Sequence, residues 1–210
     1  MKIKGARLLH REFFNRDPRD VSADLLGKLI VRREGRKSLA GRVVEVEAYL
    51  GIDDLAAHAA AGRTERNSVL FGPPGHAYVY FIYGVHYCLN ISCMPEGEAG
   101  CVLVRALEPV SGIEEMAKAR GLADLDFASA RNLRLLASGP GKLCEALDIT
   151  RARDNGKDMI SPRSDLQVMD DGYQAGNVAV TRRIGVTKSA EMPLRYVVAG
   201  SPFISVKVPS

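Results

Sequence analysis

The stretch Gly41-Arg-Val-Val-Glu-Val-Glu-Ala-Tyr-Leu-Gly51 alternates apolar residues with residues of other kinds. Successive side chains of a β-strand point to opposite faces of the sheet. A strand here would carry Val43, Glu45, Glu47 and Tyr49 on one face, while its other face would be wholly apolar. The pattern therefore predicts a strand that buries one side and presents two carboxylates and a phenol on the other.

A second stretch, from Ala77 to Ser92, is rich in aromatic residues and contains Gly84 near its middle. Two such runs joined by a short segment with glycine are typical of a β-hairpin. The turn would carry Tyr83 and Val85, where a soluble hairpin usually places polar residues. We therefore expect a protruding aromatic hairpin.

The rest of the chain contains short segments of both kinds. Helices are expected at 22–27, 55–60, 113–120, 128–137 and 143–147. Strands are expected at 28–33, as the hairpin partner of 41–50, and at 101–107, 166–169, 178–181, 183–186, 194–198 and 204–208. Strands outnumber helices and several have hairpin spacing, so the sequence predicts one α+β domain, residues 1–210, around a mostly antiparallel sheet.

Composition sets broad limits on function. With 210 residues, 46% hydrophobic and 26% charged, the chain is typical of a soluble globular domain. The 29 Lys and Arg against 25 Asp and Glu permit a polyanionic partner without requiring one. No apolar run approaches the ~20 residues that span a bilayer, and the start of the chain lacks a signal-peptide core, so we expect no membrane association.

The four cysteines form no C-x-x-C pair, the spacing that a structural zinc site usually needs. Cys88 alternates with apolar neighbours and is expected to be a buried free thiol. A reducing, cytoplasmic compartment is the corresponding expectation.

Glu45 and Glu47 have two interpretations. In the first, they belong to the solvent-exposed face of an edge strand and have no function, since functional carboxylates are the minority. Tyr49 on the same face, followed closely by His58, instead favours a general-base site. His58 itself could be a core histidine with satisfied hydrogen bonds. A metal site would need Glu47, Asp53, Asp54 and His58 to converge, and no known ligand spacing supports that, so no metal is expected.

Arg105 lies inside an apolar strand, where a buried charge requires a partner, and Glu45 or Glu47 is the natural one. Such a pair could be structural or functional. Ser138-Gly-Pro-Gly-Lys142 places backbone amides and a lysine at a helix start, which suits one phosphate of a polymer. It lacks Walker spacing, and an ordinary capped turn explains it equally well.

Taken together, these motifs resemble the alkyladenine (3-methyladenine) DNA glycosylase family over about residues 13–206. The resemblance is carried by segments 44–51, 57–58, 66–67, 71–75, 78–84 with Asn90, 103–109, 138–143, 183–185, 193–196 and 200–202. It implies a single α+β domain with no cofactor and no metal. It also implies a monomer that binds double-stranded DNA through the minor groove, associated with the nucleoid if the source is bacterial.

The resemblance also assigns roles to individual residues. Glu47 matches a general base that activates water against the sugar, and Arg105 matches an arginine near that water. The residues that match the walls of a pocket for a flipped-out base are Tyr49, His58, Tyr80 and Asn90, with Asn90 excluding guanine. The matches to DNA contacts are Tyr83, which fills the gap left by the base, Val85, where the family more often has methionine, and Lys142.

The implied activity is DNA repair by base excision. The enzyme would flip out alkylated purines, with deaminated purines left open, and would hydrolyse the N-glycosidic bond with a Glu-activated water, leaving an abasic site. Two other classes remain as alternatives. A non-catalytic nucleic-acid-binding module would explain the aromatic residues but not the acids with Arg105, and a metal-dependent hydrolase would use His58 but lacks ligand spacing.

Overall fold

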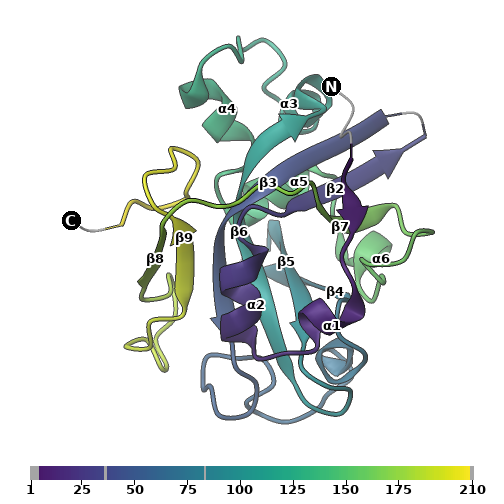
Figure 1. Ribbon diagram of the computed structural model, residues 1–210, viewed down its shortest axis with the longest axis vertical. Coiled ribbons are helices and arrows are strands. Elements are labelled where there is room, and N and C mark those ends of the chain that lie inside the picture. Colours follow the sequence, from purple (N-terminus) through teal and green to yellow (C-terminus); the bar gives the residue numbers. More distant parts are fainter. Residues whose placement is uncertain (1–4, 36, 83, 209–210) are drawn as a thin grey trace.

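The computed structural model describes residues 5–35, 37–82 and 84–208, whose strands join into a nine-stranded sheet (Figure 1). The strands are β1 (Arg7–Leu8), β2 (Leu29–Glu34), β3 (Lys37–Tyr49), β4 (Ala77–Ile82), β5 (His86–Cys93), β6 (Gly100–Ser111), β7 (Leu166–Asp170), β8 (Val178–Thr181) and β9 (Arg195–Val198). The main order is β1-β7-β2-β3-β6-β5-β4, with β9 on β3 and β8 on β9. Every strand pairing in these residues is antiparallel.

Short helices surround this sheet. They are α1 (Arg11–Phe14), α2 (Pro18–Leu25), the 3₁₀ helix η1 (Ser68–Phe71), α3 (Ile113–Ala119), α4 (Ala130–Ala137), α5 (Pro140–Ala146) and α6 (Arg151–Asp154). In Figure 1, α3 and α4 lie at the upper end of the molecule, and β8 and β9 form its left side. The predicted single α+β domain with a mostly antiparallel sheet is confirmed. No helix of the described residues is long and apolar enough to cross a membrane.

Strand β3 is the centre of the sheet because it pairs with three partners. One of its edges follows β6, while its other edge pairs with β2 over residues 37–42 and with β9 over residues 45–47. The pairing of β2 with β3 confirms the predicted hairpin. The register against β6 shifts between Val43 and Glu45 and again before Val46, which is the signature of a bulge where one partner gives way to the next.

The bulge changes which residues share a face. Val43 packs in the main core with Val46 and Ala48, whereas Val44 belongs to a smaller cluster that includes Phe203. The prediction that Val43 shares a face with the glutamates is therefore wrong. Strict alternation fails at this point because the bulge inserts an extra residue into one strand of the pair.

Beyond the bulge, alternation organises the sheet into a core face and a second face. The main core takes Ala77 and Val79 from β4, while Tyr78 and Tyr80 belong to a cluster on the other side. The same alternation runs through β5 and β6, where Leu89, Ile91, Val102 and Val104 enter the core. Four neighbouring strands, β3, β6, β5 and β4, thus present every second residue to the second face.

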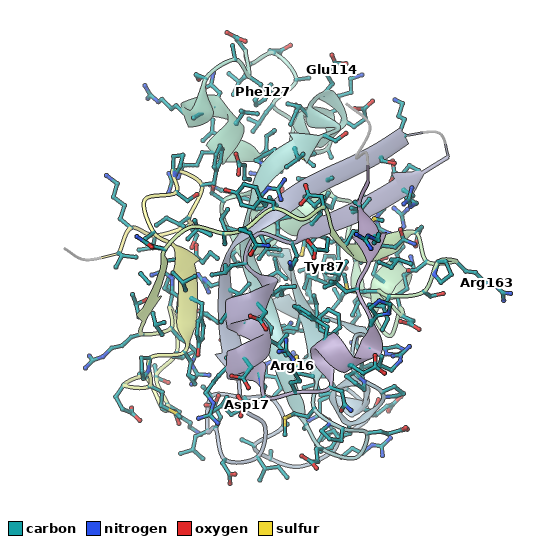
Figure 2. All side chains as sticks on the ribbon, viewed as in Figure 1. Arg16, Asp17, Tyr87, Glu114, Phe127 and Arg163 are labelled. Carbon is teal, nitrogen blue, oxygen red and sulfur yellow. The ribbon has the colours of Figure 1, made fainter. Side chains whose placement is uncertain are left out.

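Helix α2 begins at an earlier residue than predicted. Its N-cap is Asp17, labelled in Figure 2, whose carboxylate accepts a hydrogen bond from the backbone N–H of Arg19 at 2.8 Å. Pro18 follows at the first helical position, where a proline costs no hydrogen bond. The predicted start near residue 22 is wrong because the Asp-Pro signal precedes it. Gly27, with φ +86°, comes just after the helix, as expected of a helix stop.

Three other predicted elements are wrong. Residues 55–60 form turns, not a helix, and residues 183–186 and 204–208 are not strands. In residues 183–186 and 204–208, a backbone N–H group that a strand could use is bound to a side chain instead. Ile184 N–H donates to Glu47, and Ser205 N–H donates to Glu45. Carboxylates from β3 therefore take the place of strand pairing.

Candidate active site

Glu45 and Glu47 are fully buried in β3 beside Arg105 of β6. Arg105 Nε donates to Glu45 Oε1 at 3.0 Å, and its Nη1 lies 3.2 Å from Glu47 Oε1. The predicted pairing of Arg105 is confirmed with both acids. The interpretation of the glutamates as the solvent-exposed face of an edge strand is wrong, because both side chains are buried. Two buried carboxylates require compensating charge and hydrogen bonds.

Glu45 is bound mainly by the C-terminal part of the chain. Its Oε1 accepts hydrogen bonds from Arg195 Nε and from Ser205 Oγ, each at 2.8 Å, and its Oε2 accepts one from Ser205 N. Arg195 is almost fully buried. Together with Arg105 Nε, these groups give Glu45 four hydrogen-bond donors. Glu45 thereby joins β3 to β9 and to the segment after β9, which is a structural role.

Glu47 has a different set of partners. Ile184 N donates to its Oε1 at 2.7 Å, and the Tyr49 hydroxyl donates to its Oε2 at 3.0 Å. Burial raises the pKa of Glu47 above the ordinary value of 4.5, and the charge of Arg105 and these two donors oppose the rise. A carboxylate with a raised pKa is a stronger proton acceptor when ionised.

A cavity of about 520 Å³ lies on the second face of the sheet. Its lining includes Tyr49 of β3, Cys101, Leu103 and Arg105 of β6, Cys88 and Asn90 of β5, and Tyr78 and Tyr80 of β4. The lining is completed by Phe81 and Ile82 of β4, by Pro140 of α5, and by the loop residues Ala56, His58, Arg66, Ile184, Gly185 and Val186. The alternation of four adjacent strands therefore builds most of the floor from residues far apart in the sequence.

Aromatic rings form one wall of the cavity. The ring centroids of His58 and Tyr80 are 4.5 Å apart, and His58 Nδ1 lies 2.9 Å from the Tyr78 hydroxyl. Burial lowers the pKa of His58, and the positive charge of Arg66 adds to the effect, so the imidazole is neutral near neutral pH. The alternative of a core histidine is wrong, because the side chain of His58 faces this cavity.

Asn90 lies in the floor with two buried thiols. Its Nδ2 donates to the Tyr78 carbonyl at 3.1 Å, and the Cys101 thiol donates to its Oδ1 at 3.8 Å. All four cysteines are free and buried, which confirms the prediction for Cys88. Burial raises the pKa of Cys88 to about 11 and that of Cys101 to about 12.

Glu47 itself does not line the cavity. Its side chain is fully buried, whereas the partners that bind it, Tyr49, Arg105 and Ile184, all do line the cavity. A general base that activates water would have to open onto the pocket, and the carboxylate of Glu47 does not do so here. The carboxylate lies one layer behind the wall, and a water molecule reaches it only if Tyr49, Arg105 or the 184–186 segment moves.

Two of the residues expected to contact DNA, Val85 and Lys142, are separate from this cluster. Val85 is 65% exposed and Lys142 is exposed on α5, and neither lines the cavity. Tyr83 lies outside the described residues. Gly141 packs against β5, since a Cβ there would lie 2.9 Å from His86 Cγ. Close packing against His86 thus explains why residue 141 of the Ser138–Lys142 motif is glycine, without a role in phosphate binding.

The sequence interpretation missed a buried ion pair between Asp54 and Arg183. Both side chains are 0% exposed. From the sequence, Asp54 was predicted only as a candidate metal ligand, not as the partner of an arginine. The signal that identified Arg105, an arginine among apolar residues, also applies to Arg195, which stands between Leu194 and Tyr196. It does not apply to Arg183, which follows Thr181 and Arg182. Over residues 5–35, 37–82 and 84–208, no three His, Cys, Asp or Glu side chains cluster as they would around a metal ion.

Comparison with known proteins gives one family. The profile described as Methylpurine-DNA glycosylase (MPG) matches residues 12–202, which is most of the chain and includes every group that lines the cavity. The match also spans Glu45, Glu47 and Arg105.

Individual relatives agree with the profile. A protein of Koribacter versatilis is 65% identical over 199 residues, which cover 95% of this chain and 93% of the relative. Relatives from Methanoculleus marisnigri and Alkaliphilus oremlandii are 46% and 42% identical over 92% and 95% of this chain, and over 96% and 99% of their own lengths. All three are provisionally named 3-methyladenine DNA glycosylase.

Proposed function

Because the chain belongs to the methylpurine-DNA glycosylase family, we propose that it removes alkylated purines from DNA and leaves an abasic site. It would be a monofunctional hydrolase of N-glycosyl bonds, formed by one domain over residues 1–210. The observation that carries this proposal is the aromatic cavity beside the buried Glu47 and Arg105. A cavity of about 520 Å³ is of the size that holds a small organic ligand.

The cavity chemistry suits a base extruded from the helix. Chemistry at the sugar carbon requires the nucleotide to rotate out of the stack, at a cost of a few kcal/mol that is lower for damaged pairs. Tyr49, His58 and Tyr80 offer ring faces, and a cation over such a face gains about 0.5–2 kcal/mol. Many alkylated purines are cationic and need no acid to leave. Deaminated purines, which are neutral, would depend more on Asn90 and on shape.

Glu47 would act as the general base. Its Oε2 accepts one described hydrogen bond, from Tyr49, and so keeps lone-pair capacity for a water molecule. A shift of the Tyr49 hydroxyl when the base enters would admit that water. Glu47 would take its proton as oxygen attacks the sugar carbon, and the ionised carboxylate would stabilise the oxocarbenium-like charge. Arg105, beside Glu47, would orient the same water.

DNA contacts are assigned to the turn between β4 and β5 and to α5. Tyr83 and Val85 would enter the minor groove and occupy the space left by the extruded base. Lys142 would contact a phosphate. These contacts need only one copy of the chain, so the proposed active form is a monomer on duplex DNA.

The direct test is release of purines from methylated duplex DNA in the presence of excess chelator. We expect free 3-methyladenine or 7-methylguanine by chromatography, together with abasic sites and no strand cleavage. Binding without release would favour a non-catalytic nucleic-acid-binding module. A strict requirement for added metal would favour a metal-dependent hydrolase.

The pH dependence of excision should report Glu47. The base must be ionised, and burial raises its pKa, so activity should be lost as pH falls through a midpoint above 4.5. Tyr49→Phe removes a donor that lowers this pKa and should move the midpoint further up. Profiles of kcat/KM against pH for both proteins check this. If Tyr49→Phe leaves the midpoint unchanged, the loss of activity at low pH does not come from protonation of Glu47.

Tyr83→Ser should weaken binding to damaged duplex by about tenfold, because a stacking aromatic contributes on the order of 1–3 kcal/mol. Binding to a duplex with a stable abasic analogue measures the effect. The control is Tyr173→Ser, which alters an exposed tyrosine beside Arg42 and away from the cavity. Equal affinities for the Tyr83 variant and the wild type would remove Tyr83 from the DNA contacts.

A further inference from the structure

A buried ion pair outside the cavity joins the segments that form one side of it. Arg183 Nη1 and Nη2 contact the two carboxylate oxygens of Asp54 at 2.5 and 2.8 Å. Neither residue lines the cavity. A bidentate arginine–carboxylate pair fixes direction as well as distance, because both groups are planar.

On the acidic side, the pair fixes the loop after β3. Asp54 Oδ2 accepts a hydrogen bond from Leu50 N at 3.2 Å, and its Oδ1 accepts one from Ala56 N at 3.1 Å. Ala56 lines the cavity, and His58 follows two residues later. The carboxylate thus sets the path of the loop that carries the imidazole.

On the basic side, Arg183 reaches two further segments. Its Nη1 donates to the Ala48 carbonyl of β3 at 3.1 Å, and its Cζ lies 4.6 Å from the centre of the Tyr49 ring. Its Nη2 donates to the Ser189 carbonyl at 3.3 Å, which closes the 183–189 segment. The next residue, Ile184, presents its N–H to Glu47.

Stability alone does not account for this arrangement. Burying an ion pair costs desolvation free energy, and apolar residues of similar volume are often equally stable. What an apolar pair would not provide is the fixed orientation of the Tyr49 ring and of the Ile184 amide. Both of these groups donate to Glu47.

We propose that Arg183, with Asp54, is a positioning residue that holds the Tyr49 hydroxyl and the Ile184 amide against the Glu47 carboxylate. Its effect on the reaction rests on the proposed function, in which Glu47 is the base. In this role Arg183 makes no contact with the substrate. It acts through these two donors, and its charge also interacts with that of Glu47, an interaction that a lysine at this position would keep. The pair also sets where the wall in front of Glu47 can open, since Tyr49 and the 184–186 segment belong to that wall.

The test compares Arg183→Lys with Arg32→Lys. Lysine keeps the charge but loses the two-point contact and the flat stacking over Tyr49. Misplacing catalytic groups by about 1 Å costs about 10²-fold, so Arg183→Lys should slow single-turnover excision by that factor without weakening binding to an abasic-analogue duplex. Arg32 and Asp154 form an equally buried pair at 2.8 Å outside the cavity lining, and Arg32→Lys should retain the wild-type rate.

A second measurement does not depend on activity. In protein labelled with ¹³C at glutamate carboxyl groups, the titration midpoint of Glu47 should rise in Arg183→Lys, because the Ile184 and Tyr49 donors lower its pKa. Asp54→Glu, which keeps the charge but displaces the carboxylate, should raise the midpoint as well, and it replaces Arg183→Lys if the lysine variant does not fold.

The outcomes separate this proposal from the proposed function. A wild-type protein that releases no purine, with the Glu47 midpoint still moved by Arg183→Lys, would overturn the function and support the positioning role. An unmoved midpoint would overturn the positioning role, whatever the activity. So would equal slowing by Arg183→Lys and Arg32→Lys, since loss of any buried pair would then suffice.

Discussion

Glu47→Gln is expected to lower the single-turnover rate of purine release by about 10³-fold, within the range that a general base contributes. The amide is nearly isosteric, but it cannot accept a proton from water. Affinity for damaged duplex should be retained, because Glu47 lies behind the wall of the cavity and not in it. Quench experiments with enzyme in excess over methylated duplex, paired with a binding titration, measure both quantities.

Glu45→Gln is the matched control for this prediction. Glu45 lies two residues away on the same strand, is equally buried and shares Arg105, but its other partners are Arg195 and Ser205. The control should lose stability and keep excision in the folded fraction. Excision near the wild-type rate in Glu47→Gln would refute Glu47 as the base, and would show that its position behind the wall excludes it from the reaction.

Arg105→Met should destabilise the fold by about 3–5 kcal/mol, the usual cost of removing one partner of a buried ion pair. Two fully buried carboxylates would share a site with one cation fewer, and the pKa of Glu47 would rise further because Arg105 lowers it. A folded-state pKa above the unfolded one means that the native protein binds more protons. Stability is then lost as pH rises from about 4.5 through the folded pKa.

Urea unfolding at several pH values tests this prediction. The deficit of Arg105→Met should be smallest in acid and should increase toward neutral pH. The double variant Arg105→Met/Glu47→Gln removes the uncompensated charge and should recover part of the lost stability at neutral pH. Its loss of stability should then be smaller than the sum of the losses in the two single variants. A deficit that is the same at every pH would mean that lost packing, and not an unpaired carboxylate, accounts for the effect.

The sequence predicted the parts of the structure that depend on local pattern. The strands around the aromatic and acidic stretches follow from period-two alternation, and the Arg105 pairing follows from the cost of burying a lone charge. These are strong local signals, because each one requires only neighbouring residues or a single physical rule.

What the sequence could not predict depends on contacts between distant residues. The bulge in β3 arises where β2 gives way to β9, so no pattern within residues 41–51 reveals it. The same holds for the segments around Ile184 and Ser205, whose amides bind carboxylates more than 130 positions earlier in the chain. The depth of Glu47 behind the cavity wall likewise depends on the fold as a whole.

The burial of the four thiols has a consequence for survival under chemical stress. Reagents that methylate purines also attack sulfur, and they do so through the thiolate. Burial holds the pKa values of all four cysteines above the ordinary value of 9.0, so thiolate is scarce at physiological pH. We therefore expect these thiols to react slowly with the same reagents that produce the damage this family removes.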